Sequence, residues 1–341
     1  MKKLVFGSLN VDRVYSLEQF VQPGQTVAAH GYECICGGKG FNLATAMARA
    51  GEEVWFAGSI GPDGELFLKA MGEMGIHTEW LNRSALPCGH AVIQVNQNGE
   101  NCIIVEKGAN ADIPEAYIRR VLDAFGQGDL LVVQNEIANL PAIIKLARQK
   151  QMVIAWNPSP VDPKLDPELF ASADILFLNE VEAAALAGEQ DMDKALSVLK
   201  QRYPGQMIVL TLGGQGAVCQ APDGRRFKTA AFSVPVKDTT AAGDTFTGYF
   251  LSGYFRHGQI PQALRTASAA AALSVSKKGA SISIPTAQQV ERLEQHAEQA
   301  HPAGAGHGRK KRDRRPICHR LGASLAGPVL CGGRLCGSVF P

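Results

Sequence analysis

The sequence predicts an α/β protein with a doubly wound, mainly parallel sheet that is flanked by helices and carries a small β-sheet lid. Apolar runs of strand length alternate with segments of helical periodicity through most of residues 1–300, which favours a parallel sheet covered on both faces. Residues 10–36 and 86–106 hold strand-like pieces with no helix between them, and we expect these to form the lid. With 341 residues, 45% of them hydrophobic, the chain is long enough to bury a large core.

The first 110 residues contain the first elements of the sheet and both parts of the lid. Residues 40–51 are predicted to form a helix closed by Gly51, because glycine commonly ends a helix in the left-handed conformation. The turn signal Gln97-Asn98-Gly99 predicts a hairpin in the second lid region. The expected elements are a strand at 3–7, a lid strand at 26–35, a helix at 40–51, a strand at 53–60, a helix at 65–75 and lid strands within 90–105.

After residue 110 the alternation becomes regular. Pro114 suits the first turn of a helix, where a missing backbone N–H costs little. The expected elements are helices at 114–126, 139–151, 181–189 and 286–300, and strands at 129–136, 152–160, 174–180 and 207–214. The carboxyl ends of parallel strands meet at one edge of a sheet, so a ligand site is expected there, under the lid.

Composition divides the chain near residue 300. Residues 1–300 carry a net charge of −5, and nothing in this balance suggests nucleic-acid binding. Residues 301–341 hold eight Lys or Arg and one acid among many glycines, and we expect a disordered tail outside the folded domain. The alternatives are a localisation or anionic-surface signal in the basic run, and a metal site formed by the tail's cysteines and His319.

The cysteines and the N-terminus bear on the compartment. Eight cysteines in this length do not make a disulfide scaffold, and Cys34 and Cys36 lack the usual zinc-ligand spacing, so we expect buried free thiols. The N-terminal segment turns polar at Asn10 and Asp12, after an apolar run too short for a signal peptide. No apolar run approaches the ~18 residues of a transmembrane helix. We therefore predict a cytoplasmic protein without a membrane partner.

Polar sequences follow several predicted strands at the edge where a ligand would bind. They are GSLNVD at 7–12, GGKGFN at 37–42, QNE at 134–136, NEVE at 179–182, TLGGQG at 211–216 and DTTAAGD at 238–244. Each is a weak signal by itself: Gly40 follows Lys39 where a Walker A loop needs Ser or Thr, Asn179 could cap a helix, and Asp244 could be a helix-terminal acid. Their recurrence at one edge of the sheet predicts a ligand site.

The combination of DTTAAGDTFTG with GGKGFN upstream and KKGASIS downstream resembles the ribokinase-like carbohydrate kinases, also called the phosphofructokinase B family. The similarity extends from about Lys3 to about Glu298, with the motifs in the expected order. Within the family, GSLNVD, GGKG and the strand ends of the NE type are most similar to the ribokinases. The resemblance implies a kinase domain over residues 1–300 and ATP-dependent phosphorylation of a sugar, with the 5-hydroxyl of D-ribose as the expected acceptor.

The resemblance assigns the chemistry to the start of the helix that holds Asp244. Ala241, Ala242, Gly243 and Asp244 would form an anion hole from free backbone N–H groups, which receives the charge of the transferring phosphoryl group. A larger side chain than that of Gly243 would block the phosphate. Asp244 is similar to the family's catalytic base, which accepts the proton of the attacking hydroxyl as the new P–O bond forms.

The resemblance also implies a sugar site and a nucleotide site. The expected sugar-binding residues are Asn10, Asp12, Gly38, Lys39, Gly40, Asn42, Glu136 and Asp244. The expected ATP-binding residues are Asn179, Glu182, Thr211, Leu212, Gly213, Gly214, Gln215, Gly216, Gly243 and Ser268. Asn179 and Glu182, three apart and hence on one face of a helix, would organise Mg²⁺ and phosphate through water. Ser268 replaces a histidine that some ribokinases carry near adenine.

A monovalent cation, K⁺, is expected beside the anion hole. The family's ligand positions fall on Asp238, Thr240, Ser274, Lys277, Gly279 and Ser283. Most of these residues would bind through backbone carbonyls, and only Asp238 supplies a formal charge. The alternative is that this loop is simply well packed.

Other functions remain open at this level. A nucleoside kinase needs apolar groups to hold a base, whereas the candidate sugar positions are mostly polar; Phe41, however, lies in the sugar loop and could narrow or redirect the pocket. A fructokinase of the family often carries a small residue in place of Lys39. A non-catalytic sugar sensor is the alternative of another class. Family members often pair through the lid, so a homodimer through this sheet is expected.

Overall fold

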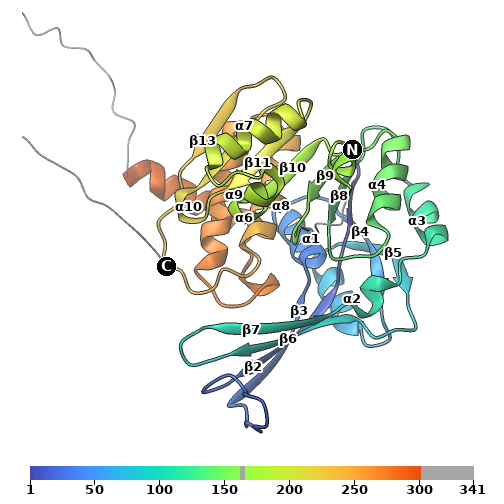
Figure 1. Cartoon of the computed structure of the whole chain (residues 1–341), viewed down its shortest axis with the longest axis vertical. Coiled ribbons are helices and arrows are strands. Elements are labelled where there is room, and N and C mark those ends of the chain that lie inside the picture. Colours follow the sequence, from blue (N-terminus) through green and yellow to red (C-terminus); the bar gives the residue numbers. More distant parts are fainter. Residues whose placement is uncertain (162–165, 301–341) are drawn as a thin grey trace, which may run out of the picture. The chain divides into compact units, whose positions relative to one another are not determined.

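The central sheet follows the predicted alternation. The computed structural model describes residues 1–161 and 166–300, and within them nine strands join in the order β13-β12-β11-β10-β9-β8-β1-β4-β5 (Figure 1). These strands are β1 (Lys3–Phe6), β4 (Trp55–Ile60), β5 (His77–Arg83), β8 (Leu130–Gln134), β9 (Val153–Asn157), β10 (Ile175–Asn179), β11 (Met207–Thr211), β12 (Ala217–Gln220) and β13 (Arg226–Thr229). All neighbours from β11 to β5 pair in parallel, whereas β12 and β13 are antiparallel. The predicted doubly wound, mainly parallel sheet is confirmed.

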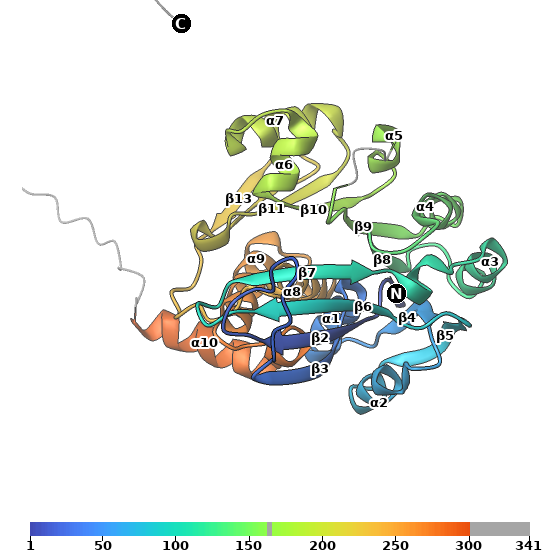
Figure 2. The same ribbon diagram turned by 60° about the horizontal axis from the view of Figure 1, so that its bottom comes forward.

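Helices cover both faces of this sheet (Figure 2). One face carries α1 (Lys39–Arg49), α2 (Glu65–Glu73), α8 (Ala242–His257), α9 (Ile260–Val275) and α10 (Ala287–Ala300). The other carries α3 (Glu115–Leu122), α4 (Leu140–Gln149), α5 (Pro167–Phe170), α6 (Glu180–Ala187) and α7 (Met192–Arg202). In β1, Val5 points into the first core, and Leu4 and Phe6 point into the second. Burying each such side chain contributes about 1.5–3 kcal/mol, which is why these strands are apolar throughout.

The lid is a separate sheet. It consists of β2 (Asn10–Ser16), β3 (Gly31–Gly37), β6 (Gly89–Val95) and β7 (Asn101–Glu106), in the order β3-β2-β6-β7 among the described residues. The predicted hairpin joins β6 to β7, and Gly99 adopts φ +79° in its turn. The prediction of a strand from residue 26 is wrong, because β2 ends at Ser16, whose partner is Gly31, and leaves nothing for earlier residues to pair with.

The order of the strands defines where a ligand binds. From β1 the central sheet grows first through β4 and β5 on one side, and then from β8 onward on the other side of β1. The direction in which successive strands are added therefore reverses beside β1. Ligands of such sheets bind beyond the carboxyl ends of the strands at this reversal. The GSLNVD segment leaves β1 at this point and continues directly into β2 of the lid.

Other sequence predictions have mixed outcomes. Cys88 and Cys219 are buried free thiols as expected, but Cys34 and Cys102 are exposed because they lie on the outer strands of the lid. No helix in residues 1–161 and 166–300 is long and apolar enough to cross a membrane. The predicted disordered tail, 301–341, and its alternative roles lie outside the described residues.

Candidate active site

The N-terminus of α1 packs directly against the end of β1. Gly38 precedes α1 with φ +91°, and a Cβ atom there would lie 2.8 Å from the backbone nitrogen of Asn10. A Cβ atom on Gly40 would lie 2.4 Å from the backbone nitrogen of Ser8. The glycines of GGKG are therefore needed for the close approach of helix to strand. Gly40, predicted to bind sugar, is buried in this contact, and its N–H donates to the Ser8 hydroxyl.

Glu136 connects the loop after β8 to the start of α1. Its Oε2 accepts hydrogen bonds from the backbone N–H of Lys39, at 3.1 Å, and from the hydroxyl of Ser8. The backbone N–H of Gly40 in turn donates to the Ser8 hydroxyl at 3.3 Å. A carboxylate at a helix N-terminus is favoured by the helix dipole. Both bonds to Glu136 use Oε2, so Oε1 remains available for a ligand hydroxyl.

Asp244 lies in the first turn of α8 with only 6% of its surface exposed. Its Oδ2 accepts a hydrogen bond of 3.1 Å from the side-chain amide of Asn42. Burial raises the pKa of Asp244 to about 6, opposed by Lys39 and Asn42 and reinforced by the carboxylates of Glu136 and Glu182. The Oδ1 atom of Asn42 is buried and has no hydrogen-bond partner within the described residues. A ligand hydroxyl would satisfy this acceptor.

The pKa values of the buried Asp12 and the half-buried Lys39 both respond to the carboxylate of Glu136. Burial, and secondarily the carboxylate of Glu136, raises the pKa of Asp12 to about 7. A Cβ atom on Gly37 would lie 2.0 Å from Asp12 Oδ2, so glycine at this point of β3 leaves the Asp12 carboxyl group in its present position. Burial lowers the pKa of Lys39, but Asp244, Glu136 and Glu182 raise it by more, and the side chain stays an ammonium. The predicted sugar residues thus share one electrostatic environment.

The turn before α8 has the geometry of an anion-binding site. Ala241 adopts φ +61°, a left-handed conformation that costs a non-glycine residue about 1–2 kcal/mol. The N–H of Ala242 bonds to Thr239 O at 3.2 Å, whereas the next N–H groups, of Gly243 and Asp244, have no intrahelical acceptor. A Cβ atom on Gly243 would have no neighbour within 4 Å, so this face of the helix is open.

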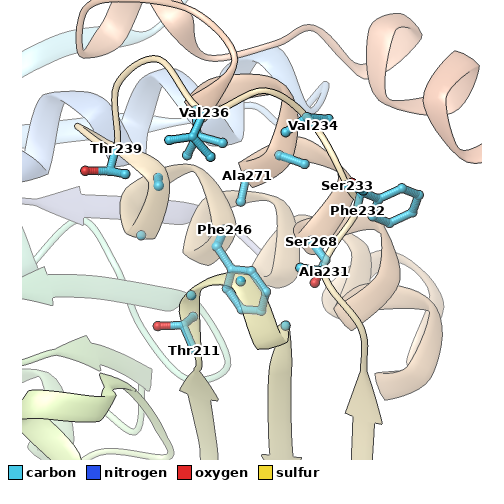
Figure 3. A pocket seen from close by; sticks show the side chains of 17 residues that line it. Thr211, Ala231, Phe232, Ser233, Val234, Val236, Thr239, Phe246, Ser268 and Ala271 are labelled. Atoms are coloured by element: carbon cyan, nitrogen blue, oxygen red, sulfur yellow. The ribbon is translucent and has the colours of Figure 1, made fainter.

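A cavity of about 510 Å³ adjoins this helix terminus. It lies between the start of α8, the loop after β11, α9 and the segment after β13 (Figure 3). The residues lining it are Thr211, Gly213, Gly214, Gly216, Ala231, Phe232, Ser233, Val234, Val236, Thr239, Ala242, Gly243, Phe246, Ser268, Ala271, Ala272 and Val275. This volume is within the range of ligand pockets. Of the predicted nucleotide loop, Leu212 and Gln215 do not line it.

Asn179 and Glu182 contact each other at the start of α6. Asn179 Oδ1 accepts from the N–H of Glu182 at 2.9 Å, and Glu182 Oε2 accepts from the N–H of Asn179 at 3.0 Å. Asn179 therefore precedes the helix as its cap, and the two residues form a capping box rather than two positions on one helical face. Glu182 is 6% exposed and still acts on the charges of Lys39 and Asp244.

The residues predicted to hold a monovalent cation lie in two connected segments, the turn before α8 and the stretch from the last turn of α9 to the 3₁₀ turn Ser281–Ser283. Asp238 Oδ1 accepts from the N–H and the hydroxyl of Thr240 at 2.9 and 2.6 Å, and Oδ2 accepts from the N–H of Gly279 at 2.9 Å. These donors, with Lys278, outweigh burial and lower the pKa of Asp238. The hydroxyls of Ser274 and Ser283 lie 2.9 Å apart. The remaining predicted residue is Lys277, whose N–H bonds to Ser274 O at 3.1 Å.

Three features of the site differ from what the sequence suggested or were not predicted. The side chain of Phe41 is 1% exposed and packs edge-to-face on Phe67 in the core, so it does not narrow the sugar pocket. Ser8 was not predicted, although it follows the same strand end as Asn10. The apolar lining of the cavity, including Phe232 and Phe246, was also missed; the run AAFSVPV at 230–236 was its only sequence signal. Figure 3 shows the Phe246 ring projecting from α8 toward Thr211.

Comparisons with known proteins agree with this arrangement. Residues 2–287 match the family described as pfkB family carbohydrate kinase. The ribokinase of Haemophilus influenzae is 37% identical over 303 residues, which cover 86% of this chain and 98% of that protein. Among solved structures, a Thermotoga maritima ribokinase has a TM-score of 0.79 at 31% identity and covers 86% of this chain and 99% of its own. An Arabidopsis thaliana ribokinase complexed with ribose and ATP has a TM-score of 0.76 at 28% identity, over 86% of this chain and 98% of its own. The predicted resemblance is confirmed, and the chain belongs to the pfkB family of carbohydrate kinases.

Proposed function

We propose that the protein transfers the γ-phosphoryl group of ATP to the 5-hydroxyl of D-ribose, giving D-ribose 5-phosphate. One observation carries this proposal. Asp244 bonds to Asn42, which with Asp12, Lys39 and Glu136 makes up the polar cluster of the site. Asp244 also belongs to the same helix turn whose Ala242 and Gly243 line the cavity. A carboxylate between a polyol-binding cluster and a nucleotide-sized cavity is the arrangement that phosphoryl transfer to an alcohol requires.

Asp244 acts as the base in this reaction. With a pKa of about 6 it is mostly ionised at neutral pH, and its Oδ2 is held by Asn42. A carboxylate is far too weak to ionise an alcohol in advance. It orients the hydroxyl and takes the proton while the new P–O bond forms.

The start of α8 stabilises the charge of the migrating phosphoryl group. The N–H groups of Gly243 and Asp244 lie at the positive end of the helix dipole, on a side with no Cβ atom at Gly243. The ammonium of Lys39 adds positive charge next to Asp244. These groups are already in place before the reaction, so little reorganisation is needed in the transition state.

The sugar is held by the polar cluster beneath the lid. Asp12 and Glu136 Oε1 accept hydrogen bonds from hydroxyls, whereas Lys39 donates one. Asn42 contributes its unsatisfied Oδ1. A site built from such paired polar groups strongly rejects analogues that lack a hydroxyl.

Two metal ions complete the proposed site. Mg²⁺ would bind near Glu182, mainly through water, and would neutralise phosphate charge; Glu182 fits because Asn179 uses only one of its carboxylate oxygens. K⁺ would be held by carbonyl groups of the segments 238–240 and 274–283, which the Asp238 carboxylate connects beside α8. These segments fit a hard cation because they offer oxygen ligands around one carboxylate.

The protein is further proposed to be a cytoplasmic homodimer that pairs through the lid. Tyr32 and Ile104 are 54% and 66% exposed, and the strand register places them on the same face of the lid. An exposed apolar sheet face favours pairing with a second copy. The exposed free thiols of Cys34 and Cys102 suit a reducing compartment. Sedimentation of the purified protein tests the dimer, and a monomer at micromolar concentration would contradict it.

An ADP-release assay tests the function. D-ribose, deoxyribose, fructose and a set of nucleosides are each offered with Mg²⁺-ATP and K⁺. The proposal expects the highest kcat/KM with D-ribose. A preference for a nucleoside or for fructose would replace the ribose assignment with another kinase of the family. Absence of turnover with every acceptor would favour a sugar sensor instead.

A further inference from the structure

Asn110 is a buried polar residue that the proposed reaction does not use. It lies in the 3₁₀ turn Gly108–Ala111 that follows the lid, with 1% of its surface exposed. We infer that Asn110 is a positioning residue, which fixes the side-chain amide of Asn10 so that Asn10 presents its Nδ2 donor to the sugar. This inference rests on the proposed sugar kinase activity.

The backbone of Leu9 determines the orientation of the Asn110 amide. Asn110 Oδ1 accepts from the N–H of Leu9 at 3.0 Å, and Asn110 Nδ2 donates to the carbonyl of Leu9 at 3.1 Å. A backbone N–H can only donate and a carbonyl can only accept. The two ends of the Asn110 amide therefore cannot exchange places without breaking both bonds.

The fixed amide of Asn110 in turn orients Asn10. The second proton of Asn110 Nδ2 is donated to Asn10 Oδ1 at 2.8 Å. Asn10 Oδ1 is thereby held toward Asn110, and Asn10 presents its own Nδ2, with two protons, to the sugar site. The neighbouring Asp12 and Glu136 are acceptors, and the Nδ2 of Asn10 joins the Lys39 ammonium as a donor, so each sugar hydroxyl meets a partner of defined type. A flipped Asn10 would present an oxygen to the same ligand atom and lose that bond.

The neighbouring backbone leaves little space around the side chains of Asn10 and Asn110. A Cβ atom on Gly89 would lie 2.1 Å from Asn110 Nδ2 and 2.4 Å from Asn10 Oδ1, so only glycine fits at the start of β6. The carbonyl of Asn110 accepts from the N–H of Ala138 at 2.9 Å, two residues beyond Glu136. Asn110 thus connects Asn10 of β2 with the segment after β8 that holds Glu136 and Ala138.

Asn110→Asp tests the inference, because it keeps the shape and the acceptor for Leu9 N–H but replaces the Nδ2 donor by an oxygen. We expect the sugar KM to rise about 10- to 100-fold, and the ATP KM to change by less than about threefold. The same substitution in an Asn10→Ala background should raise the sugar KM by less than about threefold further, because the residue it positions is already absent.

The matched control is Asn139→Asp. Asn139 Nδ2 donates to the carbonyl of Ile113 at 2.8 Å, in the same region but without contact to Asn10. It should change the sugar KM by less than about threefold. If Asn110→Asp does not fold, Asn110→Ser, which adds no charge, is measured in the same two backgrounds with the same expectation.

The inference would be overturned if the Asn110 substitution raised the sugar KM by the same factor in the wild-type and Asn10→Ala backgrounds, or if the ATP KM rose in parallel. Either result would mean that Asn110 has only a structural role. All values are taken with the sugar that the wild-type protein phosphorylates fastest, and calorimetry with that sugar gives its Kd independently of turnover. A wild-type preference for another sugar would contradict the ribose proposal but not the coupling. Ribose turnover with independent Asn10 and Asn110 effects would contradict only the coupling.

Discussion

Asp244→Asn tests the assignment of the base with little change of shape. The residue is 6% exposed and bonded to Asn42, and an asparagine oxygen can still accept that bond. Loss of a general base costs about 10²- to 10⁴-fold in rate. This corresponds to about 3–5 kcal/mol of transition-state stabilisation. We expect kcat to fall by this factor while the Kd for D-ribose stays within about threefold of the wild-type value.

The pKa of Asp244 adds a second, quantitative criterion. With a pKa of about 6, the carboxylate fraction in the free enzyme is roughly 0.9 at pH 7 and roughly 0.1 at pH 5. A carboxyl group with a raised pKa is protonated on the acid side, so the base is lost as the pH falls. The Asp244→Asn variant has no such group. The ratio of wild-type to variant kcat/KM should therefore shrink about tenfold between pH 7 and pH 5.

The assay is coupled ADP release at saturating Mg²⁺-ATP, with calorimetry for D-ribose binding. Asp223→Asn is the control, since it removes a carboxylate from the exposed turn between β12 and β13. The base assignment fails if Asp244→Asn retains more than about a tenth of wild-type kcat. It also fails if the wild-type to variant ratio does not change with pH.

Four further outcomes are expected. Burial shifts the pKa of Asp12 from 3.8 to about 7, so the folded state is destabilised as the pH rises through this window. The Asp12→Asn substitution should therefore raise the free energy of unfolding by up to about 4 kcal/mol at pH 8 and by almost nothing below pH 4. An equal gain at both pH values, measured by urea unfolding, would contradict this. Gly243→Val should raise the ATP KM at least about tenfold, because the valine side chain would enter the cavity, while the Kd for ribose measured by calorimetry stays unchanged. An unaltered ATP KM would exclude Gly243 from the nucleotide site. Exchange of K⁺ for tetramethylammonium should lower kcat several-fold, and the Asp238→Asn substitution should abolish this dependence of kcat on K⁺. If kcat is the same with both cations, the loop is well packed but does not activate the enzyme through K⁺. Deletion of 301–341 should leave kcat/KM within about twofold of the full chain, and a large loss would assign the tail a function.

The sequence was most informative where periodicity and short connections agree. The segment 129–151 gave β8 and α4 within a few residues, because every residue of β8 is buried and α4 has a clear apolar face. The edge strand β5 was missed, since HTEWLNR is half-exposed and has no strict alternation of buried residues. The hairpin of β12 and β13 was missed for a similar reason, as β13 alternates weakly over only four residues.

For the candidate site, the strand-end motifs identified the residues that the fold brings together. Asn42 and Asp244 meet although they are 202 positions apart, because α1 and α8 pack against each other on one face of the sheet, with Gly248 of α8 against Ala46 of α1. Asn110 was not predicted, because its contacts with Leu9 and Asn10 span 101 and 100 positions and leave no local pattern. For Asn179 the local sequence was sufficient, because its role as a helix cap could be stated from the sequence as the alternative to a phosphate-site role.

The position of the transferred phosphate tests the central claim most directly. D-ribose, ATP, Mg²⁺ and K⁺ are incubated with the protein, and the product is examined by ³¹P and ¹H NMR. We expect stoichiometric ADP and a single new phosphomonoester whose phosphorus couples to the two protons on C5. A phosphate coupled to C1 instead, or ADP formed without any phosphorylated ribose, would contradict transfer to the 5-hydroxyl.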